Sequence, residues 1–236
     1  MANIRTLRIL EYVKARKTCS MKELMEKFKI SAATLHRDVT ALVARNAVEH
    51  VHGGILYKPE RDTRGSSSTY QERVVTNRAA KVAIAEKAIA LIEEDDIVFL
   101  DSSTTVYELA VLLSKADFQH LTVITNAVPV MHLFSNMPTN WARVGLGGNY
   151  DPQLNSMLGA ATLEELSRLN ITKAFLSAFG LDDKVATTNH ERQAELLMKV
   201  IGCSDKCYLA VDASKKGRRG LYRIADRSDF TAIISR

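Results

Sequence analysis

The stretch that decides the fold is SAATLHRDVTAL, residues 31–42. Ser31 is a good helix N-cap, because its hydroxyl can accept hydrogen bonds from the free amides of the first turn. Leu35, Val39 and Leu42 recur at i, i+4 and i+7, a spacing that places them on one buried stripe. The other face has the short donors and basic groups that a recognition helix needs in the major groove, namely Thr34, His36, Arg37, Thr40 and Arg45. An ordinary amphipathic helix with a solvated face would share this pattern, so the flanking residues decide between them.

The residues before this stretch predict two further helices. Residues 4–14 place Ile4, Leu7, Leu10 and Val13 at helical spacing. Ser20 and Glu23 form the pattern of a capping box, in front of a helix that buries Met21, Leu24 and Phe28. Residues 28–31 leave room only for a tight turn. Helix, helix, short turn and helix within about 40 residues is the helix-turn-helix arrangement.

A short hairpin is expected at residues 48–57, where apolar residues alternate around Gly53 and Gly54. In a winged helix, such a hairpin lies along the phosphate backbone or in the minor groove. His50 and His52 share a strand face, as two metal ligands would. No cysteine or carboxylate stands at a suitable spacing from them, so we predict no metal site.

The distribution of charge favours a nucleic-acid-binding first quarter. Residues 1–64 contain 13 Lys or Arg and 7 Asp or Glu, a balance of +6, whereas the remainder has 19 and 20, a balance of −1. A basic head on a near-neutral body is typical of proteins that bind nucleic acid. A merely solvated basic surface would give the same balance.

The composition, 46% hydrophobic and 25% charged, is typical of a soluble globular protein. No apolar run approaches the roughly 20 residues that cross a bilayer, and the start of the chain does not resemble a signal peptide. The three cysteines are odd in number and lack Cys-x-x-Cys spacing, which favours neither a disulfide framework nor a zinc site. We therefore expect a protein of the reducing cytoplasm, with no membrane partner.

From residue 97 onwards, apolar runs alternate with helical stretches, which predicts an α/β fold with helices on both faces of a parallel sheet. Residues 59–69 are polar, contain three consecutive serines and read as a linker, and residues 70–92 resume a helical pattern. The expected domains are 1–58 for DNA binding, 59–72 as linker and 73–236 for effector sensing. The expected strands are 97–100, 121–124, 142–146, 174–176, 207–211 and 232–234, with helices at 106–113, 160–169 and 191–201.

Four of the expected strands end in motifs suited to a ligand, and ligands of such sheets bind at the carboxyl ends of the strands. Residues 101–105 (DSSTT) place hydroxyls and amides at a helix N-terminus, which suits phosphate. Residues 125–126 add Thr-Asn, residues 147–148 add Gly-Gly, where missing side chains let a ligand approach the backbone, and residues 212–215 add a lysine. Ser and Thr also cap helices without any ligand, so the argument rests on the four motifs together.

These motifs, the 31–42 helix and the VHGG run at 51–54 resemble the DeoR family of bacterial transcriptional regulators, and the resemblance extends over essentially the whole chain. It implies an α+β winged helix-turn-helix domain joined to a larger α/β domain related in fold to ribose-5-phosphate isomerase. The Asp-x-Gly-Thr-Thr loop of the family becomes DSSTT, and Glu191 stands where the family has an acidic residue. The chain departs from the family at His36 and His50, which replace arginines, at Ser103, which replaces glycine, and at Lys173, which replaces aspartate and would alter the outer pocket.

The resemblance implies a repressor of a carbohydrate-catabolism operon that is controlled by a phosphorylated sugar and needs no cofactor. It would act as a homo-oligomer, a dimer or higher, because one such helix makes too small an interface for specificity. The expected contacts to operator DNA come from Ser20, Ser31, Ala33, Thr34, His36, Arg37, Thr40, His52 and Gly53. The expected contacts to the effector come from Asp101, Ser102, Ser103, Thr104, Thr105, Asn126, Gly147, Gly148, Glu191 and Lys215.

Two other functions could use the same residues. A sugar-phosphate isomerase with a regulatory N-terminal domain could take acid–base groups from Asp101, Asp182, Glu191 and Lys215, but an isomerase has no use for a wing. A CoA-binding or protein-interaction module rests on fold analogy alone.

For the DNA-binding reading, histidine in place of arginine gives a charge that changes near neutrality. We therefore expect operator affinity to be weaker and more pH-dependent than in arginine-bearing relatives.

Overall fold

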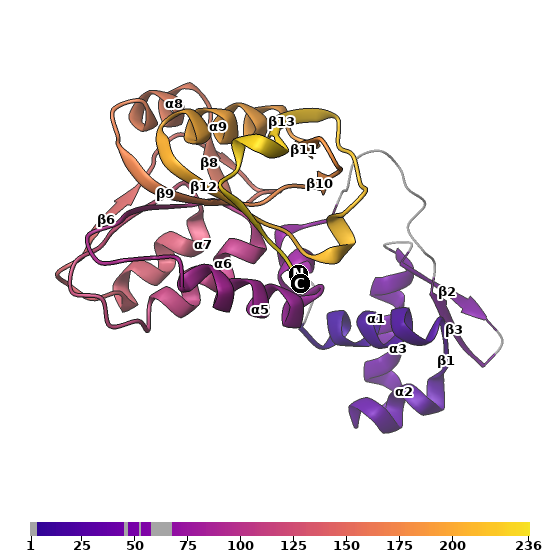
Figure 1. Ribbon diagram of the computed structural model, residues 1–236. Coiled ribbons are helices and arrows are strands. Elements are labelled where there is room, and N and C mark those ends of the chain that lie inside the picture. Colours follow the sequence, from indigo (N-terminus) through magenta and orange to yellow (C-terminus); the bar gives the residue numbers. More distant parts are fainter. Residues whose placement is uncertain (1–3, 45–46, 52, 58–67) are drawn as a thin grey trace. The chain divides into compact units, whose positions relative to one another are not determined.

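The computed structural model describes residues 4–44, 47–51, 53–57 and 68–236. The chain divides into two compact units, Met1–Thr63 and Arg64–Arg236, and each unit has its own hydrophobic core. Both units are drawn in Figure 1.

The first unit is a winged helix-turn-helix, as the sequence predicts. Its three strands pair antiparallel in the order β1-β3-β2, and its helices enclose a core that includes Leu24, Leu35, Val39 and Leu42. In chain order its elements are α1 (Ile4–Arg16), β1 (Thr18–Ser20), α2 (Met21–Phe28), α3 (Ala32–Ala44), β2 (Val48–Val51) and β3 (Gly54–Tyr57).

Two details of this unit differ from the expectation. Leu7 and Val13 of α1 are buried as predicted, but Ile4 is 70% exposed and Leu10 is only half-buried, and Ile9 is fully buried instead. The strand β1 was not expected either. It is three residues long, and only pairing with β3 identifies it as a strand, so no local pattern of alternation could have indicated it.

The second unit is built on a six-stranded parallel sheet, and all six predicted strands belong to it. The strand order is β14-β12-β9-β4-β5-β6, so the chain leaves β4 on one side and returns on the other side with β9. Such a reversal leaves a crevice at the carboxyl ends of the two strands, where α/β proteins bind their ligands. The strands are β4 (Ile97–Leu100), β5 (Thr122–Thr125), β6 (Ala142–Gly145), β9 (Ile171–Leu176), β12 (Ser204–Ala210) and β14 (Ala232–Ile234).

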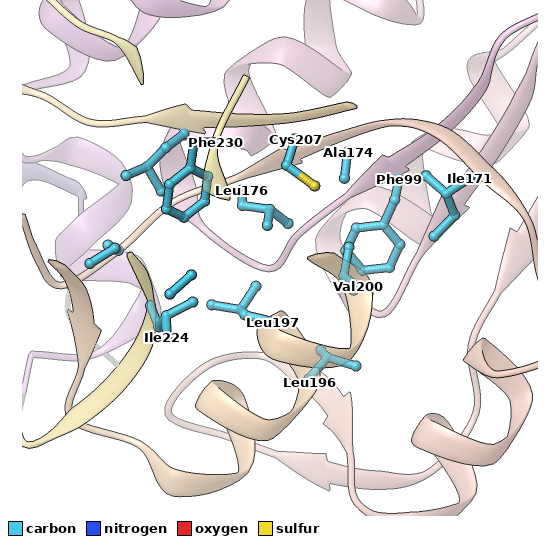
Figure 2. Packing of buried hydrophobic residues seen from close by; sticks show 14 of the residues in the cluster. Phe99, Ile171, Ala174, Leu176, Leu196, Leu197, Val200, Cys207, Ile224 and Phe230 are labelled. Atoms are coloured by element: carbon cyan, nitrogen blue, oxygen red, sulfur yellow. The ribbon is translucent and has the colours of Figure 1, made fainter. Parts of the chain in front are cut away.

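Helices cover both faces of the sheet, as predicted (Figure 1). Alternate side chains of a strand point to opposite faces, so Val98 and Leu100 enter one core and Phe99 enters the other. Figure 2 shows the second core, in which Phe99 and its neighbours in the sheet face Leu197 and Val200 of α9. The helices are α5 (Arg78–Ile89), α6 (Thr104–Leu113) and α7 (Val128–Met131) on the first face, with α8 (Ala160–Leu166) and α9 (Glu191–Gly202) on the second.

The helical pattern expected over residues 70–92 is interrupted. It forms α4 (Tyr70–Val75) and then α5, because Thr76 is extended and Asn77 adopts a left-handed conformation with φ of 54°. Asparagine tolerates that conformation better than most residues. Residues 68–75, of which 68–72 fall in the expected linker, therefore belong to the second unit as a capped helix.

Several short elements escaped prediction because each is only two to five residues long. The strands among them pair antiparallel outside the main sheet, and the others are single turns. They are β7 (Asn149–Asp151), β8 (Ser156–Leu158), β10 (Gly180–Leu181), β11 (Val185–Thr188) and β13 (Tyr222–Asp226), with 3-10 helices His132–Asn136, Ala213–Lys215 and Arg227–Asp229.

Lys173 does not lie where the sequence placed it. It stands opposite Val98 in the sheet, three residues before the end of β9. Its buried ammonium forms ion pairs with Asp96 at 2.8 Å and with Glu93 at 2.5 Å. The expected effect of Lys173 on the outer pocket is therefore wrong, because the side chain is held in an ion-pair network away from the carboxyl ends of the strands.

Candidate functional site

The recognition helix α3 begins as the sequence predicts. The Ser31 hydroxyl accepts a hydrogen bond from the Thr34 amide at 3.3 Å and lies 3.0 Å from the Thr34 hydroxyl. Leu35, Val39 and Leu42 are all at most 1% exposed. The helix is thus fixed to the core by one stripe, and its orientation is set by apolar contacts rather than by the polar face.

The polar face of α3 is open to solvent. Ala33, His36, Arg37 and Thr40 are exposed, and Thr34 is half-buried. The Thr40 hydroxyl donates to the carbonyl of His36 at 2.8 Å, and Arg37 Nε donates to the carbonyl of Ala33 at 3.4 Å. The remaining donors of the guanidinium and the Thr34 hydroxyl therefore form a surface suited to base edges and phosphates.

Ser20 is exposed and caps α2, where its hydroxyl accepts from the Glu23 amide at 3.1 Å. The predicted capping box is only half formed. The Glu23 carboxylate accepts from the Tyr12 hydroxyl and from Arg16, each at 2.9 Å. Ser20 therefore has a structural task at the helix N-terminus, and its hydroxyl can reach DNA only from that position.

The wing is present as the hairpin of β2 and β3. Gly53 is exposed and has φ of 78°, a left-handed conformation that favours glycine at the turn. His50 on β2 stacks on His36 of α3, with ring centroids 6.1 Å apart and an angle of 29° between the rings. His36 and His50 thus form one pair between α3 and the wing. His52 lies outside the described residues.

Asp38 is a residue whose importance the sequence did not reveal. It is only 6% exposed, although it sits between residues of the polar face. Its carboxylate accepts from Arg5 at 2.6 Å and from the buried Thr6 hydroxyl at 2.8 Å. Burial opposes ionisation, but these hydrogen bonds outweigh it and hold the pKa of Asp38 below its usual value. Asp38 therefore ties α3 to α1. The sequence could not predict this contact, because the partners of Asp38 are distant from it in the chain.

In the second unit, Asp101 joins the two strands at which the sheet order reverses. Its buried carboxylate accepts from the Ser103 amide at 2.8 Å and from the Ser177 amide, just after β9, at 2.7 Å. Burial raises the pKa of Asp101, and these hydrogen bonds and the nearby Lys215 charge oppose that rise. Asp101 thus holds the loops in place. Ser103 likewise accepts from the Val106 amide at 3.2 Å as the N-cap of α6.

Lys215 lies at the same edge of the sheet, as predicted. Its ammonium donates to the Ala178 carbonyl at 2.6 Å and to the Ser177 hydroxyl at 3.0 Å. Burial lowers the pKa of Lys215, and the charges of Asp212 and Asp101 act in the opposite direction. A partly desolvated ammonium, held by neutral oxygens at the mouth of a parallel sheet, is a strong binding group for an anion.

A second cation, Lys81 of α5, was missed by the sequence reading. It is 4% exposed and donates to the carbonyl of Arg73. Burial, reinforced by the neighbouring charge of Lys215, lowers the pKa of Lys81 to about 8, while Asp212 raises it. In sequence, Lys81 reads as one polar residue in a helix of low amphipathicity. Only the packing of α5 brings it close to Lys215.

Three buried hydroxyl or amide oxygens near the strand ends have no hydrogen-bond partner among the described residues. They are Thr105 Oγ1, Asn126 Oδ1 and Ser156 Oγ. Asn126 follows β5 and donates to the Met157 carbonyl at 3.0 Å, and Ser156 bridges to Ala127. Buried polar atoms are normally paired, so these three atoms are available for hydrogen bonds to a further group. Ser102 and Thr104 are also buried beside this loop.

Gly147 and Gly148 approach the chain itself rather than open space. The Gly147 amide donates to Glu165 at 2.8 Å. A methyl group on Gly148 would lie 2.1 Å from the Thr162 hydroxyl oxygen and 2.8 Å from the Leu158 carbonyl oxygen. The structure therefore gives Gly148 a packing role, because atoms of the chain fill the space that the sequence suggested for a ligand.

Glu191 is exposed as the first residue of α9. Its neighbour His190 is half-buried, and burial lowers the pKa of that imidazole, with the Asp151 charge raising it and the Arg73 charge lowering it further. The beginning of α9 thus lies near Arg73 and Asp151. Among the described residues, no hydrogen bond or ion pair joins Glu191 to Lys215 or Asp101. The structure therefore does not bring all ten expected effector residues into one set of contacts.

Two negative findings concern the described part of the chain only. It contains no group of three His, Cys, Asp or Glu side chains that could hold a metal ion. No helix in it is both long and apolar enough to cross a membrane.

Comparison with known proteins gave matches over both units. The model of the DeoR-like helix-turn-helix domain matches residues 5–60, and that of the DeoR C terminal sensor domain matches residues 76–236. The chain is 29% identical to a lactose phosphotransferase system repressor of Streptococcus mutans, over 96% of this chain and 89% of that protein. It is 30% identical to an L-fucose operon activator of Haemophilus influenzae, over 99% of this chain and 91% of that protein.

Among solved structures, ribose 5-phosphate isomerase A from Methanocaldococcus jannaschii matches 60% of this chain and 55% of its own. The TM-score is 0.42 and the sequence identity is 13%.

Proposed function

The chain belongs to the DeoR family of DNA-binding transcriptional regulators, and we propose that it represses a carbohydrate-utilisation operon until a phosphorylated sugar occupies its second unit. The family relatives are regulators, so the chain is a regulator rather than the isomerase-like enzyme of the alternative reading. One of these relatives is a repressor and the other is an activator. For this chain we propose repression.

The observation that carries the effector proposal is the pair of desolvated lysines at the strand ends. Lys215 and Lys81 lie near each other, and a phosphate between them would gain charge-assisted hydrogen bonds in a partly dry site. The amides at the N-terminus of α6 and the unpaired oxygens of Thr105, Asn126 and Ser156 would then face the sugar. The sugar phosphate explains both features at once, whereas an unphosphorylated sugar explains only the second.

For DNA, the proposal assigns the contacts to the exposed face of α3 and to the wing. Thr34, His36, Arg37 and Thr40 would reach base edges or phosphates, with Ser20, Ser31, Ala33 and Gly53 at the rim. His52 is proposed as a wing contact from the sequence alone. Two copies would bind one operator, because a single recognition helix gives too little specificity. The effector would shift the population between forms with different operator affinity.

The test is a thermal-shift screen of sugar phosphates, their unphosphorylated parents, inorganic phosphate and CoA esters. A ligand at 100 times its Kd stabilises the folded state by roughly 2.7 kcal/mol, which is easily detected. We expect one sugar phosphate to stabilise the chain and its parent sugar to have no effect. Equal stabilisation by the parent sugar, or stabilisation by CoA esters alone, would refute the proposed effector class.

A pair of variants locates the site. Lys215→Met should weaken binding of that sugar phosphate by at least roughly tenfold, because a hydrogen bond to a charged group contributes about 1.5–3 kcal/mol. Lys216→Met is the matched control, since Lys216 is the exposed neighbour in the same turn. Fluorescence anisotropy with a labelled operator then measures whether the sugar phosphate lowers DNA affinity in the wild type. A rise in DNA affinity would indicate an activator-like direction instead.

A further inference from the structure

In sequence, the helix α4 stands between the segment that leads to the DNA-binding unit, residues 58–67, and the helix α5 that contains Lys81. It begins two residues after that segment with a complete capping box. The Thr69 hydroxyl accepts from the Glu72 amide at 3.3 Å, and the Glu72 carboxylate accepts from the Thr69 amide at 2.9 Å. A helix of six residues is not stable by itself, so α4 exists because the second unit holds it.

The attachment of α4 depends on Arg73. The guanidinium donates to the Ser68 carbonyl at 2.8 Å and to the Gln153 carbonyl, between β7 and β8, at 3.1 Å. It also lies over the ring of the buried Tyr70, 5.8 Å from the centroid. One cation therefore connects the start of α4, the ring beneath it and the β7–β8 hairpin.

A second polar attachment of α4 comes from Lys81 of α5. Its ammonium donates to the carbonyl of Arg73. Among the described residues, no carboxylate forms an ion pair with Lys81, although Asp212 and Glu108 lie near enough to influence it. Lys81 is only 4% exposed, and a single neutral carbonyl compensates poorly for the desolvation of its ammonium. A better acceptor placed nearby would compete for it.

Both attachments lie close to the turn that holds Lys215. Asn77, between α4 and α5, donates to the Ser214 hydroxyl at 3.3 Å. Burial and the Lys215 charge lower the pKa of Lys81, and burial and the Arg73 charge lower the pKa of Lys215, in agreement with this placement. Because a phosphate dianion is a stronger acceptor than a backbone carbonyl, it would draw both cations towards Lys215. The packing contact of Tyr70 would remain, but the polar contacts that orient α4 would weaken.

We propose that Lys81 and Arg73 serve two competing partners, the anchor of α4 and the anionic group of the effector, so that effector binding loosens α4. This rests on the proposed function, in that the effector must bind at Lys215. It adds that effector binding loosens α4, and it names Lys81 and Arg73 as the two residues through which binding would change the chain next to residues 58–67. The DNA-binding unit then responds because the chain leading to it loses a fixed end.

Amide hydrogen exchange of the full-length chain tests this directly. The probes are inorganic phosphate and the sugar phosphate identified by thermal shift. We expect the amides of residues 70–77 to exchange at least about fivefold faster with the probe bound, while those of β4 and β9 do not accelerate. Slower or unchanged exchange in α4, at a probe concentration that saturates the thermal shift, would overturn the inference and leave the proposed function intact.

Lys81→Met supplies a second measurement, with Lys87→Met as the matched control. Lys87 lies on the same helix, is exposed and donates to the Ser235 carbonyl at 2.9 Å. In Lys81→Met we expect fast exchange of α4 without any probe, no further acceleration with it, and probe binding weakened at least tenfold. Lys87→Met should match the wild type. Wild-type binding and exchange in Lys81→Met would refute the role of Lys81, and absence of any binding to wild type would refute both proposals.

Discussion

Replacing Gly148 by alanine should destabilise the second unit strongly. The added methyl group would lie 2.1 Å from the Thr162 hydroxyl oxygen and 2.8 Å from a backbone oxygen of Leu158, and φ at this position is 136°. Backbone strain of this kind costs about 1–3 kcal/mol, and overpacking costs about 1–3 kcal/mol more. The total, roughly 2–6 kcal/mol, is a large part of the roughly 5–15 kcal/mol that stabilises a typical protein. For a unit of this size it corresponds to a fall in Tm of roughly 5–20 °C.

The assay for this prediction uses the single tryptophan of the chain. Trp141 is 3% exposed and donates to the Phe118 carbonyl at 2.9 Å, so its fluorescence reports the unfolding of the second unit specifically. Gly202→Ala is the matched control, because a methyl group there meets no atom within 4 Å. It should leave Tm unchanged or raise it slightly, since alanine is favoured over glycine in a helix by about 0.5–1 kcal/mol.

A double mutant separates the clash from the backbone strain. Thr162→Ala alone loses the hydrogen bond from that hydroxyl to the Gly147 carbonyl at 2.7 Å, but it removes the atom that Gly148→Ala meets. The double mutant should therefore lose less stability than the sum of the single mutants, by at least about 0.5 kcal/mol. A wild-type Tm in Gly148→Ala would refute the packing role. Normal stability combined with loss of effector binding would restore the ligand-approach role that the sequence suggested.

Two further predictions concern the first unit. Asp38→Ala should destabilise it by about 1–3 kcal/mol at pH 7, because the buried Thr6 hydroxyl loses its acceptor, and circular dichroism should show this loss without a change in the Trp141 transition. The pKa of Asp38 is depressed in the folded state, so its contribution is complete above the ordinary carboxyl range and shrinks as pH falls below about 4; an equal difference between wild type and variant at pH 7 and pH 3 would contradict this. His36→Arg should increase operator affinity, because a guanidinium on the exposed face of α3 offers several donors to phosphates and base edges. Anisotropy titrations at one pH and one salt concentration measure this, and unchanged or lower affinity would count against it.

Much of the architecture could be predicted because it depends on local pattern. The apolar spacing of Leu35, Val39 and Leu42 gave the orientation of α3, and short apolar runs such as residues 97–100 gave all six strands of the parallel sheet. The motifs at the strand ends also predict that Asp101 and Lys215 lie at one edge of the sheet, and both side chains bond to Ser177 there. Each of these inferences needs only the residues within one element and a rule for how such elements stack.

The parts that could not be predicted depend on partners distant in sequence. Asp38 looks like a solvated residue of a polar face until Arg5 and Thr6 are beside it. Lys81 acquires its importance from Lys215, more than a hundred residues later. At Gly148 the sequence suggested that the missing side chain makes room for a ligand. In the structure, atoms of Thr162 and Leu158 fill the space beside this glycine instead.

The reversal of strand order between β4 and β9 also has a consequence for the synthesis of the protein on the ribosome. The elements of the DNA-binding unit are complete in sequence at Tyr57, whereas the proposed effector site needs Ser177 after β9 and Lys215 after β12. Domains fold as units during synthesis, and at about 5–20 residues per second the ribosome needs roughly 8–30 s to advance from Tyr57 to Lys215. Each new chain therefore passes through an interval in which its DNA-binding unit can fold while the proposed effector site is still incomplete.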